Sequence, residues 1–447
     1  MKPGERASPN AAENFARLNP LAAREYLLTI AGTLQAIFSP GFKGDARARA
    51  SECIQMLPRI AQQLAPLQGK VALALDELRR TAPSEFAQAE GRALDALEAD
   101  AAELLTQVQR IASAPSRQFD AGRLEAFVRS HPRSAPTTRL VSAKALQGGR
   151  SKQTVLVTLA DQGSQLPAEM VLRQDWSRGV PRTTVVSEYE VLKALSPFDL
   201  KMPKPVLLET ADDALGAPFM MMTRLQGKIE GSLFSPPKSE RMALELGEQL
   251  GRLHSLRTDQ FIQVPWITTK AFTHDQLRSE LDEYRTQCAM LDTPSETINA
   301  IFRWLESTIS RVEGPLSMVH GDLGFHNFLV HDGGLAGILD WELAHLGSAA
   351  EDLGYCKGDV EQMTDWPRFL RAYRDAGGPA LSEFLISFYS LWSGIHLYCM
   401  LLMARAGVTS GQVYDVEVAY CCVNATPVLV HRMSRQLRTI LDETLIK

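Results

Sequence analysis

The first quarter of the chain carries apolar residues at the spacing of amphipathic helices. Residues 12–112 are rich in Ala, Leu, Arg and Glu, and their apolar positions recur every three or four residues. The clearest runs are Leu27, Ile30, Leu34 and Phe38, and then Leu94, Leu97, Leu104 and Val108. This period predicts helices that bury one face. We therefore expect residues 1–115 to form an N-terminal bundle of three or four helices, a packing module that could also join two copies as a homo-oligomer.

The pattern changes from helices to strands after residue 116. Short β-rich segments surround one helical segment, in the order strand, glycine turn, strand, strand, helix, strand, strand. The segments are 140–146, the turn 148–152, 154–159, 169–173, the helix 184–195, 206–208 and 219–222. We therefore expect a β-rich lobe over residues 116–225.

From Lys238 onward the chain reads as mostly helical. One apolar stripe comprises Leu246, Leu250, Leu253 and Leu256, and further helical runs cover 384–404 and 416–446. The only clear strand signal in this half is a hairpin, with strands at 328–330 and 335–339 and a turn of sequence His-Asp-Gly-Gly between them. The chain is therefore predicted to be α+β, with a mainly helical lobe over residues 226–447.

One apolar segment needs a decision between a membrane span and a core helix. Residues 385–404 contain no Asp, Glu, Lys or Arg, and twenty residues are enough to cross a bilayer. The segment also holds three serines, a histidine and two tyrosines. We interpret it as the buried central helix of the helical lobe, and expect no membrane association.

Composition and charge narrow the class of protein. The chain is 45% hydrophobic and 22% charged, which is ordinary for a globular protein, and its net charge of −5 argues against a nucleic-acid-binding surface. The six cysteines are scattered, without metal-binding spacing, and the N-terminus lacks the apolar stretch of a secretory signal. These features predict a cytoplasmic location with reduced thiols.

Polar side chains flank the predicted hairpin and supply candidate chemistry. Asn327 precedes its first strand and Asp340 follows its second, so folding the hairpin brings both oxygens together. Asp322 lies five residues before Asn327. Phosphoryl transfer from a nucleotide needs such a set, because Asp322 can accept the proton of an attacking hydroxyl while Asn327 and Asp340 hold Mg²⁺. The alternative interpretation is a surface hairpin with polar flanks.

These residues give the chain a specific family resemblance. His320-Gly321-Asp322 resembles the catalytic loop of the aminoglycoside phosphotransferase family, and the Asp-Trp-Glu run that starts at Asp340 stands where protein kinases carry Asp-Phe-Gly. This family shares the bilobal protein-kinase-like fold with choline kinases. The resemblance covers about residues 118–447. It implies ATP and Mg²⁺ as cofactors, and leaves the N-terminal helices outside the common fold.

The resemblance also implies residues that bind the nucleotide. Gly148, Gly149 and Ser151 match the family's glycine turn, whose backbone amides can approach phosphates, although an isolated Gly-Gly pair also fits an ordinary hairpin. Arg173 stands where protein kinases have a lysine, and Glu188 is its expected partner unless that glutamate is simply solvated. Met222 and Arg224 fall in the connection between lobes and are candidates for contact with the base.

Three further residues are expected in supporting positions. Asp352 matches an aspartate that braces the catalytic loop, and His254 is expected to pack against that loop without acting in catalysis. His326, next to Asn327, is a candidate for contact with phosphate or substrate.

Two functions from different classes follow from these observations. The first is an ATP- and Mg²⁺-dependent phosphotransferase acting on a hydroxyl of a small molecule, such as an aminoglycoside, a macrolide, choline, a sugar amine or a hydroxyacyl-CoA. The alternative is a catalytically weak nucleotide-binding scaffold whose N-terminal helices form an interaction module. Arg173 in place of lysine favours the scaffold, whereas the intact set of Asp322, Asn327 and Asp340 favours the enzyme.

Overall fold

The computed structural model describes residues 119–146, 152–160, 165–175, 183–232, 234–269, 273–292, 295–409 and 416–445. The chain divides into two compact units, Met1–Arg117 with Tyr398–His431, and Gln118–Leu397 with Arg432–Lys447. The candidate site lies within the second unit. The helices predicted at 1–115 and the glycine turn with Gly148, Gly149 and Ser151 lie outside the described residues.

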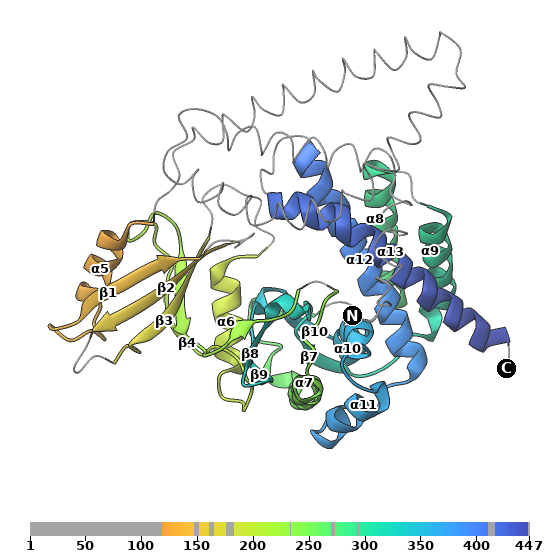
Figure 1. Cartoon of the computed structure of the whole chain (residues 1–447), viewed down its shortest axis with the longest axis horizontal. Coiled ribbons are helices and arrows are strands. Elements are labelled where there is room, and N and C mark those ends of the chain that lie inside the picture. The colour runs from red at the N-terminus through yellow and green to blue at the C-terminus, as the bar shows by residue number, and fades with distance from the viewer. Residues whose placement is uncertain are drawn as a thin grey trace, which may run out of the picture. The chain divides into compact units, whose positions relative to one another are not determined.

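A five-stranded antiparallel sheet forms the β-rich part of the second unit (Figure 1). Its strand order is β1-β2-β3-β5-β4, and helix α6 (Val185–Leu195) lies between β3 and β4 in the chain. The strands are β1 (Arg139–Ala145), β2 (Lys152–Ala160), β3 (Glu169–Asp175), β4 (Pro205–Glu209) and β5 (Phe219–Thr223). The predicted strands and helix are confirmed in their predicted order.

The two faces of this sheet have different roles. Alternate residues of β2, from Val155 to Leu159, are buried in a core that also takes in two apolar side chains of helix α5 (Ala121–Ser130). Residue Thr154 of β2 lies opposite Arg173 of β3, and Lys152 lies opposite Asp175. Because side chains alternate along a strand, Lys152 and Arg173 share the face opposite that core. The sheet therefore presents two cations on one face.

Two small sheets lie in the mainly helical part. The predicted hairpin is confirmed as β8 (Phe328–His331) and β9 (Gly334–Ile338), and β6 (Lys228–Ile229) pairs with β8. A second sheet pairs β7 (Leu316–Val319) with β10 (His345–Ser348). The prediction that the hairpin was the only strand signal in this half was therefore wrong. Both missed strands have four residues, which is too short for a clear period.

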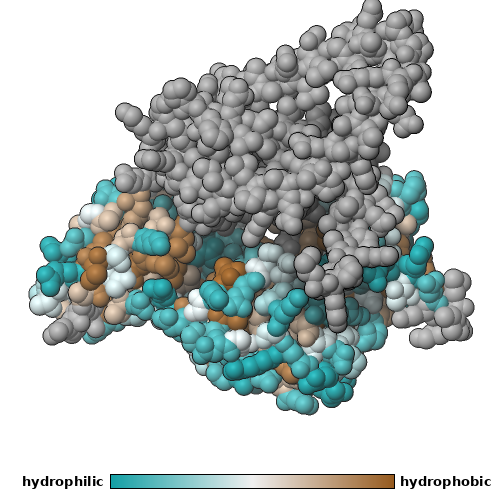
Figure 2. Space-filling model, in the orientation of Figure 1, coloured by the Kyte–Doolittle hydropathy of each residue, from teal (hydrophilic) through white to brown (hydrophobic). Residues whose placement is uncertain are grey.

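Helices make up most of this part (Figure 1). They are α7 (Glu240–His254), α8 (His274–Leu291), α9 (Glu296–Thr308), α10 (Ala349–Val360), α11 (Trp366–Asp375), α12 (Glu383–Thr409) and α13 (Val416–Leu445), with single 3₁₀ turns η1 (Thr258–Gln260), η2 (Ile309–Arg311), η3 (Phe325–Asn327) and η4 (Trp341–Leu343). Figure 2 shows a mostly hydrophilic surface over α7 and α11, and more apolar residues over the strands of the five-stranded sheet.

Helix α12 contains the long apolar segment found in the sequence. By length and composition Glu383–Gly407 could cross a membrane, and 67% of its most apolar window is buried inside the protein. Within the second unit, Phe388 stacks on Trp392 at 5.6 Å between ring centroids and lies 6.2 Å from Trp304 of α9. The contact between α12 and α9, together with this burial, agrees with our interpretation of a core helix.

Candidate active site

The loop after β7 is held by a buried carboxylate. Asp352 on α10 accepts hydrogen bonds from the backbone N–H of His320 at 2.8 Å and of Gly321 at 2.9 Å, and lies 3.1 Å from His254 Nε2. Burial alone would raise the pKa of Asp352, but the hydrogen bond and charge of His254 and His320 lower that pKa below its ordinary value. Asp352 therefore holds the loop as the resemblance implies, and His254 contacts the loop through Asp352.

The conformation of this loop requires glycine at one position. Gly321 has a φ of +82°, and a Cβ placed there would lie 2.6 Å from the carbonyl oxygen of Leu343. The neighbouring His320 ring is buried, packs on Trp341 at 4.7 Å between centroids, and lies 2.9 Å from the carbonyl oxygen of Leu339 through Nε2. Gly321 is thus fixed by sterics, and His320 by packing and a hydrogen bond.

The carboxylate of Asp322 is held at both oxygens. Asn327 Nδ2 donates to Asp322 Oδ2 at 3.0 Å, and the hydroxyl of Tyr355 donates to Oδ1 at 2.9 Å. His326 Nε2 lies 4.0 Å from Oδ2, close enough for electrostatic contact but beyond hydrogen-bond distance. The side chain of Asp322 remains 26% exposed, so it is accessible to a substrate.

The hairpin brings the backbone of its two flanking segments together. Phe328 of β8 pairs with Ile338 of β9, and the backbone N–H of Leu339 donates to the carbonyl oxygen of Asn327 at 2.8 Å. Asp340 follows with a φ of 63°, a left-handed conformation that is uncommon outside glycine. This turn directs the Asp340 side chain to Arg173, while the amide of Asn327 contacts Asp322.

Arg173 connects the sheet, helix α6 and the hairpin. Its Nη1 lies 2.5 Å from Glu188 Oε1 and 3.1 Å from Asp340 Oδ1, so the expected partner of Arg173 is in place. Glu188 is fully buried, and burial raises the pKa of its carboxyl to about 7 although the positive charge of Arg173 lowers it. Within the described part of the chain, Arg173 Nε and Glu188 Oε2 are buried without a hydrogen-bond partner.

A second ion pair in this region was missed by sequence reasoning. Lys152, 1% exposed, forms an ion pair with Glu342 of η4, and Thr183 donates to the same Glu342 oxygen at 2.9 Å. The lysine follows the glycine turn directly, and Glu342 lies two residues after Asp340. In the sequence, only the closeness of Lys152 to the glycine turn and of Glu342 to Asp340 could have suggested this ion pair.

The two remaining predicted residues lie in β5 and just after it. Met222 is buried in β5, and its pairing with Val171 puts it on the sheet face that also carries Arg173. Arg224 forms an ion pair with Glu169 at 3.0 Å. The structure thus brings together Asp322 with Asn327, and Arg173 with Glu188 and Asp340.

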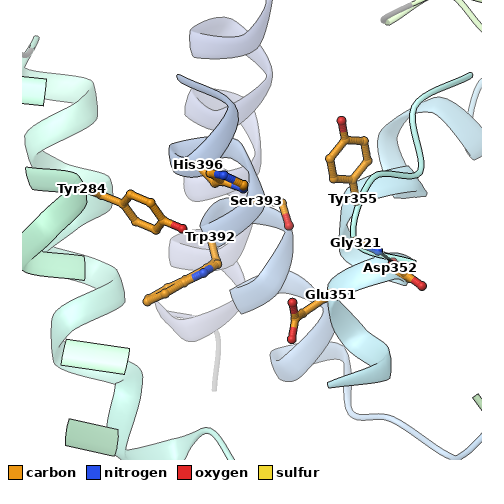
Figure 3. A pocket seen from close by; sticks show the side chains of 8 residues that line it. All are labelled: Tyr284, Gly321, Glu351, Asp352, Tyr355, Trp392, Ser393 and His396. Carbon is orange, nitrogen blue, oxygen red and sulfur yellow. Dashed lines mark hydrogen bonds between the residues drawn. The ribbon is translucent and has the colours of Figure 1, made fainter. Parts of the chain in front are cut away.

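A pocket opens beside the Asp322 loop (Figure 3). Tyr284 and Trp392 line one side and Tyr355 the other, while Gly321 and the two carboxylates lie at the α10 end. Glu351 accepts a hydrogen bond from the backbone N–H of Ser348 at 2.9 Å and lies 3.1 Å from His345 Nε2. The full lining is Tyr284, Gly321, Glu351, Asp352, Tyr355, Trp392, Ser393 and His396.

The side chains beside the hairpin fit a hard divalent cation. Glu188, Asp340 and Glu342 place carboxylate oxygens within 4.8 Å of one another, and Glu188 Oε2 lacks a partner among the described residues. Asn327 adds an amide whose Nδ2 is already used by Asp322, which leaves Oδ1 as its acceptor atom. All of these donors are oxygens, the ligand type that Mg²⁺ prefers.

A braced His-Gly-Asp loop, a metal-suited hairpin and an Arg–Glu pair under a five-stranded sheet define a phosphotransferase of the protein-kinase-like class. The family model described as "Phosphotransferase enzyme family" matches residues 142–386, more than half of the chain. The chain therefore belongs to this phosphotransferase family.

Solved structures support the same fold. A candidate aminoglycoside phosphotransferase from Ralstonia eutropha JMP134 matches with a TM-score of 0.55 at 20% identity, and the match covers 72% of this chain and 99% of that one. A macrolide 2′-phosphotransferase type I matches with a TM-score of 0.50 at 18% identity, covering 69% and 96%. At such identities the likeness establishes the protein-kinase-like fold alone.

Curated relatives carry a different kind of name. Acyl-CoA dehydrogenase family member 11 from Homo sapiens is 25% identical over 304 residues, and its counterpart from Rattus norvegicus is 27% identical over 297 residues. Each match covers 63% of this chain and 36% of the relative. The chain thus spans about a third of the length of these relatives.

Proposed function

We propose that this chain transfers the γ-phosphoryl group of ATP to a hydroxyl of a small molecule, with Mg²⁺ as cofactor. The observation that carries the proposal is the carboxylate of Asp322, which is accessible, held at both oxygens and located beside a pocket. A nucleotide-binding scaffold has no need for a carboxylate oriented in this way, so the enzyme is favoured over the scaffold.

In this proposal each polar group has a defined task. Asp322 accepts the proton of the acceptor hydroxyl, the acceptor oxygen forms a bond to the γ-phosphorus, and the bond from that phosphorus to the β–γ bridging oxygen breaks to release ADP. Asp340 and Asn327 hold Mg²⁺, which supplies positive charge to the phosphates when bound. Arg173, kept in place by Glu188, steadies the phosphates with its planar guanidinium.

The charges that line the pocket and the names of the relatives help to choose between the candidate acceptors. Asp352 and Glu351, the two carboxylates that line the pocket, are already engaged by backbone N–H groups and histidines. A polycationic acceptor would need carboxylates of its own, so the lining favours a less cationic acceptor. The acyl-CoA dehydrogenase names of the relatives make hydroxyacyl-CoA thioesters the first acceptors to test.

The decisive experiment is a turnover assay with matched binding measurements. Purified protein is incubated with MgATP and, in separate reactions, 3-hydroxybutyryl-CoA, kanamycin, erythromycin, choline or glucosamine, and the phosphorylated product is detected by mass spectrometry. We expect at least one acceptor to be phosphorylated and Asp322→Ala to lose about 10²–10⁴-fold in rate, the usual contribution of a general base. Asp322→Ala should keep its thermal stabilisation by MgATP.

Two results would count against the proposal. Normal turnover by Asp322→Ala would remove the proposed base. Stabilisation by MgATP without phosphorylation of any acceptor would instead favour the scaffold, with the N-terminal helices as its interaction module.

A further inference from the structure

One side chain contacts both the candidate base and the pocket. Tyr355 donates its hydroxyl to Asp322 Oδ1 at 2.9 Å, and it also lines the pocket opposite Tyr284 and Trp392 (Figure 3). No motif in the sequence marks this tyrosine as functional. Its position between the pocket and the carboxylate calls for an explanation.

Helix α10 fixes the position of Tyr355 relative to the loop. The helix begins with a capping box in which Ser348 and Glu351 bond each other's backbone N–H groups. Asp352 and Tyr355 are three residues apart, so they lie on the same face of the helix. Asp352 accepts the backbone N–H groups of His320 and Gly321, while Tyr355 reaches the side chain of the next residue. One helical face thus holds both the backbone and the carboxylate of the loop.

Asn327 holds the other carboxylate oxygen but has a second role. Its Nδ2 donates to Asp322 Oδ2 at 3.0 Å and to the Asp322 carbonyl oxygen at 3.1 Å. In the proposed function its Oδ1 also serves as a metal ligand. Tyr355 is the contact of Asp322 on the pocket side, so it is suited to set the direction in which the carboxylate faces an acceptor.

The chemistry of a phenol suits this task. A tyrosine hydroxyl donates one hydrogen bond and stays neutral near pH 7, so it orients a carboxylate without adding positive charge beside the phosphates. Each carboxylate oxygen has two lone-pair directions, so Asp322 can bind Tyr355 and an acceptor hydroxyl together. Small errors in the position of a catalytic group reduce rates strongly, since reaction requires a near-attack geometry.

We propose that Tyr355 is a positioning residue that orients the Asp322 carboxylate toward the acceptor pocket. This inference rests on the proposed function, because it assigns a task to the base of that reaction. It also makes the pocket beside Tyr355 the place where the acceptor hydroxyl is received.

The test separates orientation of the base from binding of substrates. Tyr355→Phe removes one oxygen and keeps the ring. For the best acceptor found in the assay above, we expect kcat to fall roughly 10- to 100-fold, while KM for ATP and for the acceptor stays within about two-fold. Tyr355→His keeps a planar ring with an N–H donor, and we expect its kcat to lie between those of wild type and Tyr355→Phe.

Tyr189→Phe is the matched control. Tyr189 is a half-buried tyrosine of α6 that does not line the pocket, so its variant should keep the wild-type kcat. Thermal unfolding of all variants identifies any that have lost the fold, and Tyr355→His then provides the measurement if Tyr355→Phe is unfolded.

The outcomes distinguish this inference from the proposed function. An active wild type with an unchanged kcat in Tyr355→Phe overturns the inference and leaves the proposed function intact. A raised acceptor KM with unchanged kcat also overturns it, because Tyr355 would then only bind substrate. A wild type that phosphorylates no acceptor overturns both, whereas a selective loss of kcat supports both.

Discussion

Arg173 Nη1 lies 3.1 Å from Asp340 Oδ1, so a guanidinium on the sheet contacts a carboxylate that the proposed function assigns to Mg²⁺. Mg²⁺ bound at Asp340 would share that carboxylate with the guanidinium. Arg173 has a second partner in Glu188 and does not depend on Asp340 for neutralisation. The site can therefore accept a metal without leaving a buried arginine unpaired.

Removal of Asp340 should abolish the metal dependence of nucleotide binding. We expect Asp340→Ala to lose most of the additional thermal stabilisation that MgATP gives over ATP alone, because a carboxylate ligand of the cation is gone. Asp275→Ala, which removes an exposed aspartate of α8, is the control and should behave as wild type. Equal stabilisation by MgATP in Asp340→Ala and wild type would place the metal elsewhere.

Loss of Lys152 should destabilise the fold. Its ammonium is buried against Glu342, and Lys152→Met leaves that carboxylate with Thr183 and a more distant Arg173. Breaking a buried ion pair from one side costs about 3 kcal/mol, which urea unfolding can measure. The double variant Lys152→Met with Glu342→Gln should recover part of the loss, since no unpaired charge remains. A single variant as stable as wild type would show that the pair contributes nothing.

Gly321→Ala should disrupt the loop more than a matched change elsewhere. A left-handed φ costs an alanine about 1–2 kcal/mol, and at Gly321 a Cβ also meets the carbonyl oxygen of Leu343 at 2.6 Å. Gly333 in the β8–β9 turn has a φ of +72° with no atom within 4 Å of a Cβ. Gly333→Ala should therefore show only the conformational cost, and Gly321→Ala a larger fall in melting temperature together with lost turnover. Equal effects would mean that the loop moves away from Leu343 at little cost.

The contribution of Asp352 to stability should depend on pH. Its pKa is lower in the folded protein than in the unfolded chain, so its stabilisation is present above the ordinary aspartate value of about 4 and is lost as pH falls through the folded value. Asp352→Asn should lower the free energy of unfolding at pH 7 by about 3 kcal/mol, since charged hydrogen bonds are lost. Below pH 4 the gap between variant and wild type should narrow. A gap that stays constant from pH 7 to pH 3 would contradict this assignment.

Short-range patterns made much of this site predictable. The turn after His331 and the apolar runs around it define the hairpin, so the proximity of Asn327 to Asp340 follows from local sequence. Glu188 could be chosen as the partner of Arg173 because the order of strands and helix matched a familiar arrangement. Both inferences needed only the order of elements along the chain.

Long-range contacts were not predictable in the same way. The pairing of Lys152 with Glu342 spans 190 residues and depends on how the sheet meets η4. Tyr355 contacts Asp322 only because α10 returns beside the loop in a register that a capping box sets. Met222, proposed as a nucleotide contact, lies on the sheet face that carries Arg173, which strand alternation shows only once its pairing with β3 is known. Periodicity gives the direction of a side chain only after the partners of its element are known.

The capping box at the start of α10 has a consequence for how the proposed activity of this chain can be lost. One extra residue between Asp352 and Tyr355 would rotate the ring about 100° around the helix while the first turn stayed anchored. Asp352 would still hold the backbone of the loop, but the Asp322 carboxylate would lose its hydrogen bond from Tyr355. A single inserted codon would therefore lower the proposed activity as strongly as loss of the tyrosine hydroxyl does, in a protein that still folds.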